Sequence, residues 1–236
     1  MSRRVRFYHT IDIREGLTLP GRYDHRPFVN AYGFPDVRGK SVLDVGRASG
    51  FFSFHFERAG AQSVVAIDLP PDRQKNVVGL DQGDAGADVG RLDFFLPHAL
   101  LKSAVKPLWL DVADISPETV GTGYDLAFVG SLLIHLADPM GVLSKVRKVM
   151  APDGVCVIAN PIGRAEHILS YVIRKPLATL VGTDSKTAWW LPNIACLKLM
   201  CLRAGFSRVE LKTRNLPLRR RNGRSLVRHA VVHAWP

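Results

Sequence analysis

SVLDVGRASGFFSFHF, residues 41–56, decides the fold of this chain. Ser41–Val45 is a short apolar run typical of a buried strand, residues 46–50 form a tight turn, and the aromatic segment that follows predicts a helix ending near Gly60. Glycine lets a ligand approach the main chain, and the start of a helix offers unpaired N–H groups. A strand, a glycine turn and a helix therefore indicate a nucleotide-type cofactor site.

The spacing within the turn separates two nucleotide chemistries. A dinucleotide-binding turn has the form G-x-G-x-x-G with a small third residue, but counted from Gly46 that position is Phe51, which is too bulky. The chain has Asp44-x-Gly46-x-Ala48-x-Gly50 instead, with an acid inside the end of the strand. These four residues are cofactor-binding candidates, and an ordinary strand-to-helix turn is the alternative.

A second acid stands at the end of a second predicted strand, residues 63–67. Asp68 follows this strand directly and lies 22 residues after Gly46. Its two carboxylate oxygens can accept both hydroxyl protons of a ribose, which is the role of an acid at this place in nucleotide-binding folds. Leu69 would then lie against the adenine. A helix cap is the alternative role for Asp68, but Pro70 and its neighbour Pro71 disfavour it.

A third acid, Asp111, follows a third predicted strand at residues 107–110. Its carboxylate can accept from an adenine amino group, and the backbone N–H of Val112 can donate to the adenine ring. Ser131 follows a fourth strand, residues 124–129, and is a further cofactor-binding candidate. His135 is the candidate general base, because its pKa range suits the work. The alternative for His135 is a helix-entry histidine that hydrogen-bonds the backbone.

The remaining chain divides into a lid, the domain and an insertion. We expect residues 1–40 to form an N-terminal lid or cap segment, and residues 41–236 to form one domain with a cap insertion at about 161–191. The stretch 20–27 should be an ordered loop or a broken helix. Tyr23, His25 and Arg26 in the lid and Trp190 in the insertion are substrate candidates, with plain packing as the alternative. The other predicted elements are helices around residues 92–101, 140–150 and 192–204, and strands at residues 155–159, 209–213 and 226–232.

Composition restricts the setting of the protein. The chain has 236 residues, of which 47% are hydrophobic and 22% charged, as in globular proteins. It contains no run of 18 apolar residues, and its basic N-terminus lacks the apolar core of a secretion signal. Cys156, Cys196 and Cys201 have no C-x-x-C spacing, so we expect reduced, buried thiols rather than disulfides or a metal site. These features predict a cytoplasmic protein with no membrane partner.

The net charge of +11 favours anionic partners. Arginines cluster near the N-terminus, at Arg3, Arg4 and Arg6, and again at residues 219–224. Such runs are usually solvated, so tRNA is a possible partner and not a required one.

The order of these elements, with acids at three successive strand ends, resembles the class I S-adenosylmethionine (SAM)-dependent methyltransferases. Their first motif is usually D-x-G-x-G-x-G, and here Ala48 replaces the middle glycine. The resemblance implies an α/β fold with a Rossmann-like seven-stranded sheet, helices on both faces and a closing antiparallel strand. It also implies SAM as the cofactor and in-line transfer of its methyl group, and we expect a small-molecule acceptor.

A narrower likeness is carried by YHTID, PGRYDHRP, GSLLIHLADP and WWLPNIACLKLMCLRAGF. These segments resemble the group around the bacterial tRNA wobble-uridine carboxymethyltransferase, which uses carboxy-SAM. Arg26 falls near a lysine of that enzyme, and Ile134 falls where it has a tyrosine. The resemblance implies a tRNA-modifying enzyme as the alternative function. A dinucleotide-dependent oxidoreductase or a non-catalytic binding module is a third class, and Phe51 argues against the oxidoreductase.

Overall fold

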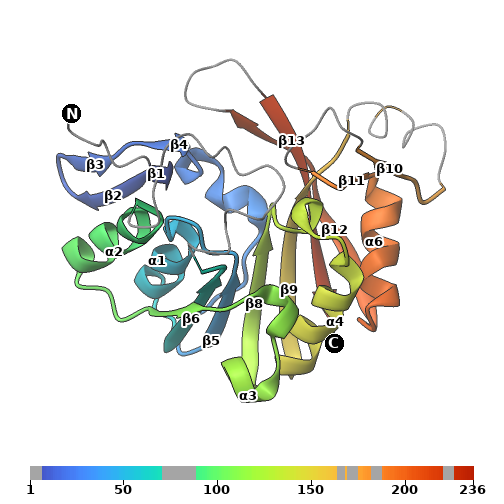
Figure 1. Ribbon diagram of the computed structural model, residues 1–236, viewed down its shortest axis with the longest axis horizontal. Coiled ribbons are helices and arrows are strands. Elements are labelled where there is room, and N and C mark those ends of the chain that lie inside the picture. Colours follow the sequence, from blue (N-terminus) through green and yellow to red (C-terminus); the bar gives the residue numbers. More distant parts are fainter. Residues whose placement is uncertain (1–6, 71–88, 164–167, 169–174, 182–187, 220–225) are drawn as a thin grey trace.

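A computed structural model describes residues 7–70, 89–163, 168, 175–181, 188–219 and 226–236. Its centre is a seven-stranded sheet in the order β12-β13-β9-β8-β5-β6-β7 (Figure 1). The strands are β5 (Ser41–Val45), β6 (Ser63–Asp68), β7 (Lys106–Trp109), β8 (Tyr124–Gly130), β9 (Met150–Pro161), β12 (Arg208–Arg219) and β13 (Leu226–Trp235). Strands β5 to β9 are parallel, and β13 runs antiparallel to both β9 and β12. The predicted sheet and its antiparallel closure are confirmed.

The strand order creates a switch point between β5 and β8. From β5 the chain proceeds outward to β6 and β7, and then crosses back to β8 on the other side of β5. In open parallel sheets, ligands bind outside the carboxyl ends of the strands at such a point. The glycine-containing turn at residues 46–50 leaves β5 at this point.

Helices cover both faces of the sheet (Figure 1). The α-helices are α1 (Phe51–Arg58), α2 (Val89–Leu101), α3 (Pro117–Val120), α4 (Pro139–Val149) and α6 (Ile194–Arg203), and the 3-10 helices are η1 (Arg26–Tyr32), η3 (Val112–Asp114) and η4 (Leu133–His135). Helix α4 begins as its sequence predicts, because Asp138 accepts from the N–H of Gly141 at 2.8 Å and Pro139 occupies the first turn.

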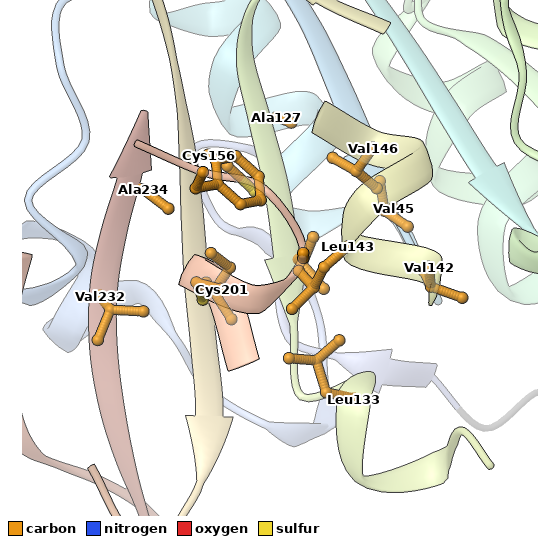
Figure 2. Close-up of a cluster of buried hydrophobic side chains, with 14 of the residues drawn as sticks. Val45, Ala127, Leu133, Val142, Leu143, Val146, Cys156, Cys201, Val232 and Ala234 are labelled. Atoms are coloured by element: carbon orange, nitrogen blue, oxygen red, sulfur yellow. The ribbon is translucent and has the colours of Figure 1, made fainter. Parts of the chain in front are cut away.

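Two apolar cores flank the sheet. Figure 2 shows one of them, in which Leu143 of α4, Cys201 of α6 and Cys156 of β9 belong to the same cluster. The other core is rich in aromatic rings from α1, β8 and the N-terminal segment, with Phe52 and Phe128 centred 4.4 Å apart. Parallel strands buried on both faces read as continuous apolar runs, which is why the sequence identified them.

The N-terminal segment is folded onto this second core. It contains β1 (Phe7–His9) paired with β4 (Gly21–Tyr23), β2 (Ile11–Arg14) paired with β3 (Leu17–Leu19), and η1. The Ala31 carbonyl accepts from Thr213 Oγ1 at 2.6 Å, and the Tyr32 carbonyl lies 3.0 Å from His233 Nε2. The segment is therefore held to β12 and β13 as well as to α1.

Several segments differ from their predicted bounds. The stretch 20–27, expected as a loop or broken helix, holds β4 and the start of η1, and the four N-terminal strands were not predicted because each has only three or four residues. Within the insertion, β10 (Ala178–Leu180) pairs with β11 (Trp190–Pro192). Strands β9, β12 and β13 extend beyond the predicted runs. The basic clusters at residues 3–6 and 220–224, and most of the glycine-rich stretch 70–90, lie outside the described residues.

Two further expectations concern the cysteines and membranes. Cys156 and Cys201 are buried, whereas Cys196 is only half-buried, and all three are free thiols. In the part of the chain that the structure describes, no helix is long and apolar enough to cross a bilayer.

Candidate functional site

The turn after β5 is built from left-handed backbone conformations. Gly46, Ala48 and Gly50 have φ values of 81°, 45° and 87°. An ideal Cβ at Gly50 would lie 2.7 Å from the rings of Phe54 and Phe94, so only glycine fits there. Ala48 adopts the same region with a Cβ, at a cost of roughly 1 kcal/mol. A glycine is usual at the middle position of the motif because it adopts this left-handed conformation without strain, and this chain has Ala48 there instead.

The end of β6 holds the turn in place. The Ile67 carbonyl accepts from the N–H groups of Gly46 at 2.9 Å and Arg47 at 3.0 Å. Asp68 continues the contact, because its Oδ2 accepts from the Ala48 N–H at 2.8 Å. The strained turn is therefore fixed by three hydrogen bonds from one strand end.

Asp68 is half-buried, and both of its carboxylate oxygens accept backbone hydrogen bonds. Oδ1 accepts from the Leu69 N–H at 2.7 Å. Burial raises the pKa of Asp68, while the Arg47 guanidinium and these N–H donors act in the opposite direction. Each carboxylate oxygen has a second acceptor position, so the side chain keeps the capacity to accept from two hydroxyl groups.

The end of β7 lies beside Asp68, since the Leu110 N–H donates to the Asp68 carbonyl at 2.9 Å. Asp111 follows and caps η3 by accepting from the Ala113 N–H at 2.9 Å. Val112 is buried beneath this cap. The second and third strand ends thus place their carboxylates at the same edge of the sheet.

Asp44 lies differently from the other two acids. Its side chain is 1% exposed and accepts from Ser53 Oγ of α1 at 2.5 Å. Burial raises the pKa of this carboxyl to about 7. In this position Asp44 ties β5 to α1 and supports the turn from below, whereas the sequence had suggested a direct contact with the cofactor.

Arg47 is a site residue that the sequence argument missed. It is 2% exposed, and its guanidinium carbon lies 4.0 Å from the ring centre of Phe94 and 4.4 Å from that of Trp109. Burial lowers its pKa, against the nearby carboxylates Asp68, Asp93 and Asp44. Its Nε and Nη2 find no hydrogen-bond partner among the described residues. An arginine inside a glycine turn was the only sequence signal, and it does not predict this burial.

The end of β8 brings a serine and a histidine together. Ser131 has a φ of 54°, and its N–H donates to the Ala159 carbonyl at 2.7 Å. Its Oγ lies 2.8 Å from Nε2 of His229 on β13, a residue that the sequence did not single out. Leu132 packs over the turn, 3.4 Å from an ideal Cβ on Gly46.

His135 ends η4 in a half-buried position. Its N–H donates to the Leu132 carbonyl at 2.9 Å, and the neighbouring Ile134 carbonyl accepts from Trp189 N–H at 2.6 Å. The insertion therefore contacts η4 close to the predicted base. The base role of His135 stays a prediction.

The lid candidates separate into two groups. Tyr23 and His25 are buried in aromatic packing, and His25 Nδ1 lies 2.9 Å from the Tyr32 hydroxyl. Burial, together with His229 nearby, lowers the pKa of His25 to about 3. Arg26 instead pairs at the surface with Asp24 and Asp12, each at 2.6 Å.

Trp190 on β11 is half-buried, and its indole N–H has no acceptor among the described residues. Of the lid candidates, His25 therefore lies near His229, which contacts Ser131, whereas Arg26 pairs with carboxylates at the surface.

The chain is similar in sequence to known methyltransferases. A family model described as a methyltransferase domain matches residues 21–211. The tRNA U34 carboxymethyltransferase of Campylobacter lari is 24% identical over 178 residues, which cover 75% of this chain and 53% of that protein. Its counterpart in Dichelobacter nodosus is 29% identical over 175 residues, covering 74% and 48%. The chain thus spans about half the length of the curated relatives it matches.

A solved structure shares the fold at low identity. The 1,6-didemethyltoxoflavin-N1-methyltransferase of Burkholderia thailandensis, with 1,6-didemethyltoxoflavin and S-adenosylhomocysteine bound, aligns with a TM-score of 0.55 and 15% identity. The alignment covers 84% of this chain and 71% of that one.

Proposed function

Because this chain belongs to the family of methyltransferase domains, we propose that it binds SAM at the carboxyl ends of β5, β6 and β7 and transfers the methyl group to a small-molecule acceptor. The observation that carries the proposal is the double role of Asp68. Its carboxylate fixes the left-handed turn through Ala48 and stands at the strand end where a ribose would lie.

The residues at this edge fit SAM chemically. Asp68 supplies acceptors for two ribose hydroxyls, Asp111 an acceptor for an adenine amino group, and Val112 a backbone N–H for the ring. Gly46 has no side chain, so its backbone is accessible to a ligand at this edge of the sheet, next to Leu132. Ser131 and Leu69 border the same edge. Bound SAM supplies a sulfonium whose methyl group is open to in-line displacement.

The chain's own contribution is positioning and exclusion of water. Well-oriented reactants can gain about 7–11 kcal/mol in this way. Residues 1–40 would act as a lid and residues 161–191 as a cap over the acceptor, with Tyr23, His25 and Trp190 as the residues nearest to it. His135 is the base that the sequence proposes. The free cysteines fit a reducing, cytoplasmic setting.

The test combines mass spectrometry of the ligand that copurifies with calorimetric titration. We expect SAM or its demethylated product to copurify, S-adenosylhomocysteine to bind with one-to-one stoichiometry, and NAD to give no heat. Copurification of NAD, or the absence of any binding of S-adenosylhomocysteine to folded protein, would contradict the proposal.

A tRNA-modifying (carboxy)methyltransferase is the second candidate function. It is favoured by the names of the two curated relatives and by the net charge of +11. Against carboxy-SAM, the guanidinium of Arg26 is engaged by two carboxylates and is not free for a third. Steep salt dependence of RNA binding, lost when Arg219 and its neighbours at residues 220–221 are neutralised, would favour this candidate. Salt-insensitive or absent RNA binding would leave the small-molecule proposal.

A further inference from the structure

Ser131 and His229 form a hydrogen-bonded pair, and the proposed cofactor site gives the imidazole of His229 no role. Ser131 Oγ lies 2.8 Å from His229 Nε2, although the two residues are 98 positions apart. His229 is 3% exposed, whereas Ser131 is half-buried at the end of β8. The serine therefore connects an enclosed imidazole with the open edge of the sheet.

The second ring nitrogen of His229 settles the direction of this hydrogen bond. Nδ1 lies 3.2 Å from the Val227 carbonyl, which can only accept. Nδ1 must therefore carry the proton, and Nε2 is the acceptor toward Ser131. The serine hydroxyl donates to Nε2, as in a nucleophile–base pair oriented by a third group.

The backbone of Ser131 is strained at this place. Its φ of 54° is uncommon for a residue with a side chain, and the strain is held by the hydrogen bond from its N–H to the Ala159 carbonyl. Such strain concentrates at functional sites. The next residue, Leu132, packs over Gly46, so the pair stands next to the proposed methyl donor.

We propose that Ser131 and His229 act as a proton-accepting pair, and that the acceptor of the methyl group is a protonated hydroxyl compound such as a phenol. This inference rests on the proposed function and names the acceptor class of that same site. Ser131 Oγ contacts the acceptor hydroxyl, and His229 Nε2 receives the proton through the serine.

The step balances in atoms and charge. The acceptor O–H bond breaks and its proton passes to Ser131 Oγ as the serine proton passes to His229 Nε2. A carbon–oxygen bond forms to the methyl group, and the electron pair of the broken carbon–sulfur bond stays on sulfur. The positive charge lost from sulfur reappears on the imidazole, so the net charge of the enclosed site does not change.

The surroundings of the pair keep the imidazole neutral before the reaction. Burial lowers the pKa of His229 to about 4. His25, the other imidazole that faces it, is also neutral at pH 7, and it lies against the Tyr32 hydroxyl. The pair thus starts neutral. The same burial opposes charging of the imidazole, so the proton transfer must accompany loss of the positive charge from sulfur.

The experiment uses the whole chain, tritiated SAM and a series of phenols. At slightly alkaline pH, 4-nitrophenol is largely ionised, whereas 4-methoxyphenol is protonated and needs a base. We expect His229→Gln and Ser131→Ala each to slow transfer to 4-methoxyphenol by about 10²-fold or more. Transfer to 4-nitrophenol by His229→Gln should change by less than about threefold, and the double variant should be no slower with 4-methoxyphenol than either single one.

His233→Gln is the matched control, because His233 is a buried histidine on the same strand whose Nε2 bonds the backbone carbonyl of Tyr32. It should leave both phenol rates unchanged. An equal loss for both phenols in His229→Gln would mean a structural role and overturn the proposal. The proposal is also overturned if His135→Ala, rather than His229→Gln, removes the dependence on phenol acidity.

Two measurements separate this inference from the proposed function. Failure to methylate any phenol while S-adenosylhomocysteine binds by calorimetry overturns the pair and leaves the cofactor site standing, whereas absence of that binding overturns the proposed function. Independently of turnover, ¹⁵N NMR of labelled histidine should show His229 as the Nδ1–H tautomer at pH 7. An Nε2–H or charged ring contradicts the pair.

Discussion

Replacing Asp68 by asparagine should separate the two tasks of this side chain. Both carboxylate oxygens accept from backbone N–H groups, those of Ala48 and Leu69. An asparagine can accept with only one atom, so its NH₂ group must face a second donor. Asp68→Asn is therefore not a conservative change: it removes one hydrogen bond from the turn and one charged acceptor from the proposed ribose position.

The magnitude follows from these two losses. A hydrogen bond to a charged group contributes about 1.5–3 kcal/mol, so the lost ribose bond and the loosened turn together cost binding roughly 3–6 kcal/mol. That loss corresponds to a Kd for S-adenosylhomocysteine weakened by about 10²–10⁴-fold. Isothermal titration calorimetry measures it, with circular dichroism to verify that the variant is folded.

Asp93→Asn is the matched control for this experiment. Asp93 is also close to Arg47, its pKa is raised to about 7 by burial, and it accepts from Ser49 Oγ at 3.2 Å. Among the described residues, Asp93 makes no contact with the N–H groups of the turn. The affinity of Asp93→Asn for S-adenosylhomocysteine should therefore stay within about threefold of the wild type. The reasoning is refuted if Asp68→Asn binds as well as the wild type, or if Asp93→Asn loses as much affinity.

Three further predictions concern stability, each measured by chemical denaturation. Ala48→Gly should leave stability unchanged or slightly higher, because relief of the left-handed strain offsets the added chain entropy, whereas Ala59→Gly at a φ of −76° should lose about 0.5–1 kcal/mol. Arg47→Met should destabilise the fold by roughly 3–5 kcal/mol, since it leaves Asp68 and its neighbouring acids without a buried counter-charge; an unchanged midpoint would contradict this role. The pKa of His229 is lowered to about 4 in the folded state, so the unfolded chain binds the proton first as the pH falls below about 6.5, and the free energy of unfolding decreases. Between pH 6.5 and pH 4 the wild type should lose about 3 kcal/mol of stability relative to His229→Gln, and parallel pH profiles of the two proteins would refute this prediction.

The strand ends were predictable from sequence because their signal is local. Asp68 and Asp111 each follow a short apolar run, and the carboxyl ends of parallel strands meet at one edge of the sheet. Asp44 carries the same signal but lies one residue inside β5, where α1 covers it. Position in the strand, and not residue type, decides whether such an acid supports the turn or faces the edge.

The other site features depend on contacts between distant segments. His229 reads as one of the few polar residues in a mainly apolar strand, and only the pairing of β13 with β9 brings it to Ser131. Arg47 becomes buried because Phe94 and Trp109 close over it from α2 and β7. Tyr23 was a lid or substrate candidate, and the structure shows it packed in the aromatic core of the N-terminal segment.

The most direct test of the central claim is a crystal structure of the chain grown with S-adenosylhomocysteine. We expect the ribose hydroxyls on the carboxylate of Asp68, the adenine beside Asp111 and Val112, and the sulfur near Ser131. Density for the ligand at any other place on the molecule, or an adenosine that leaves Asp68 without contact, would contradict the account.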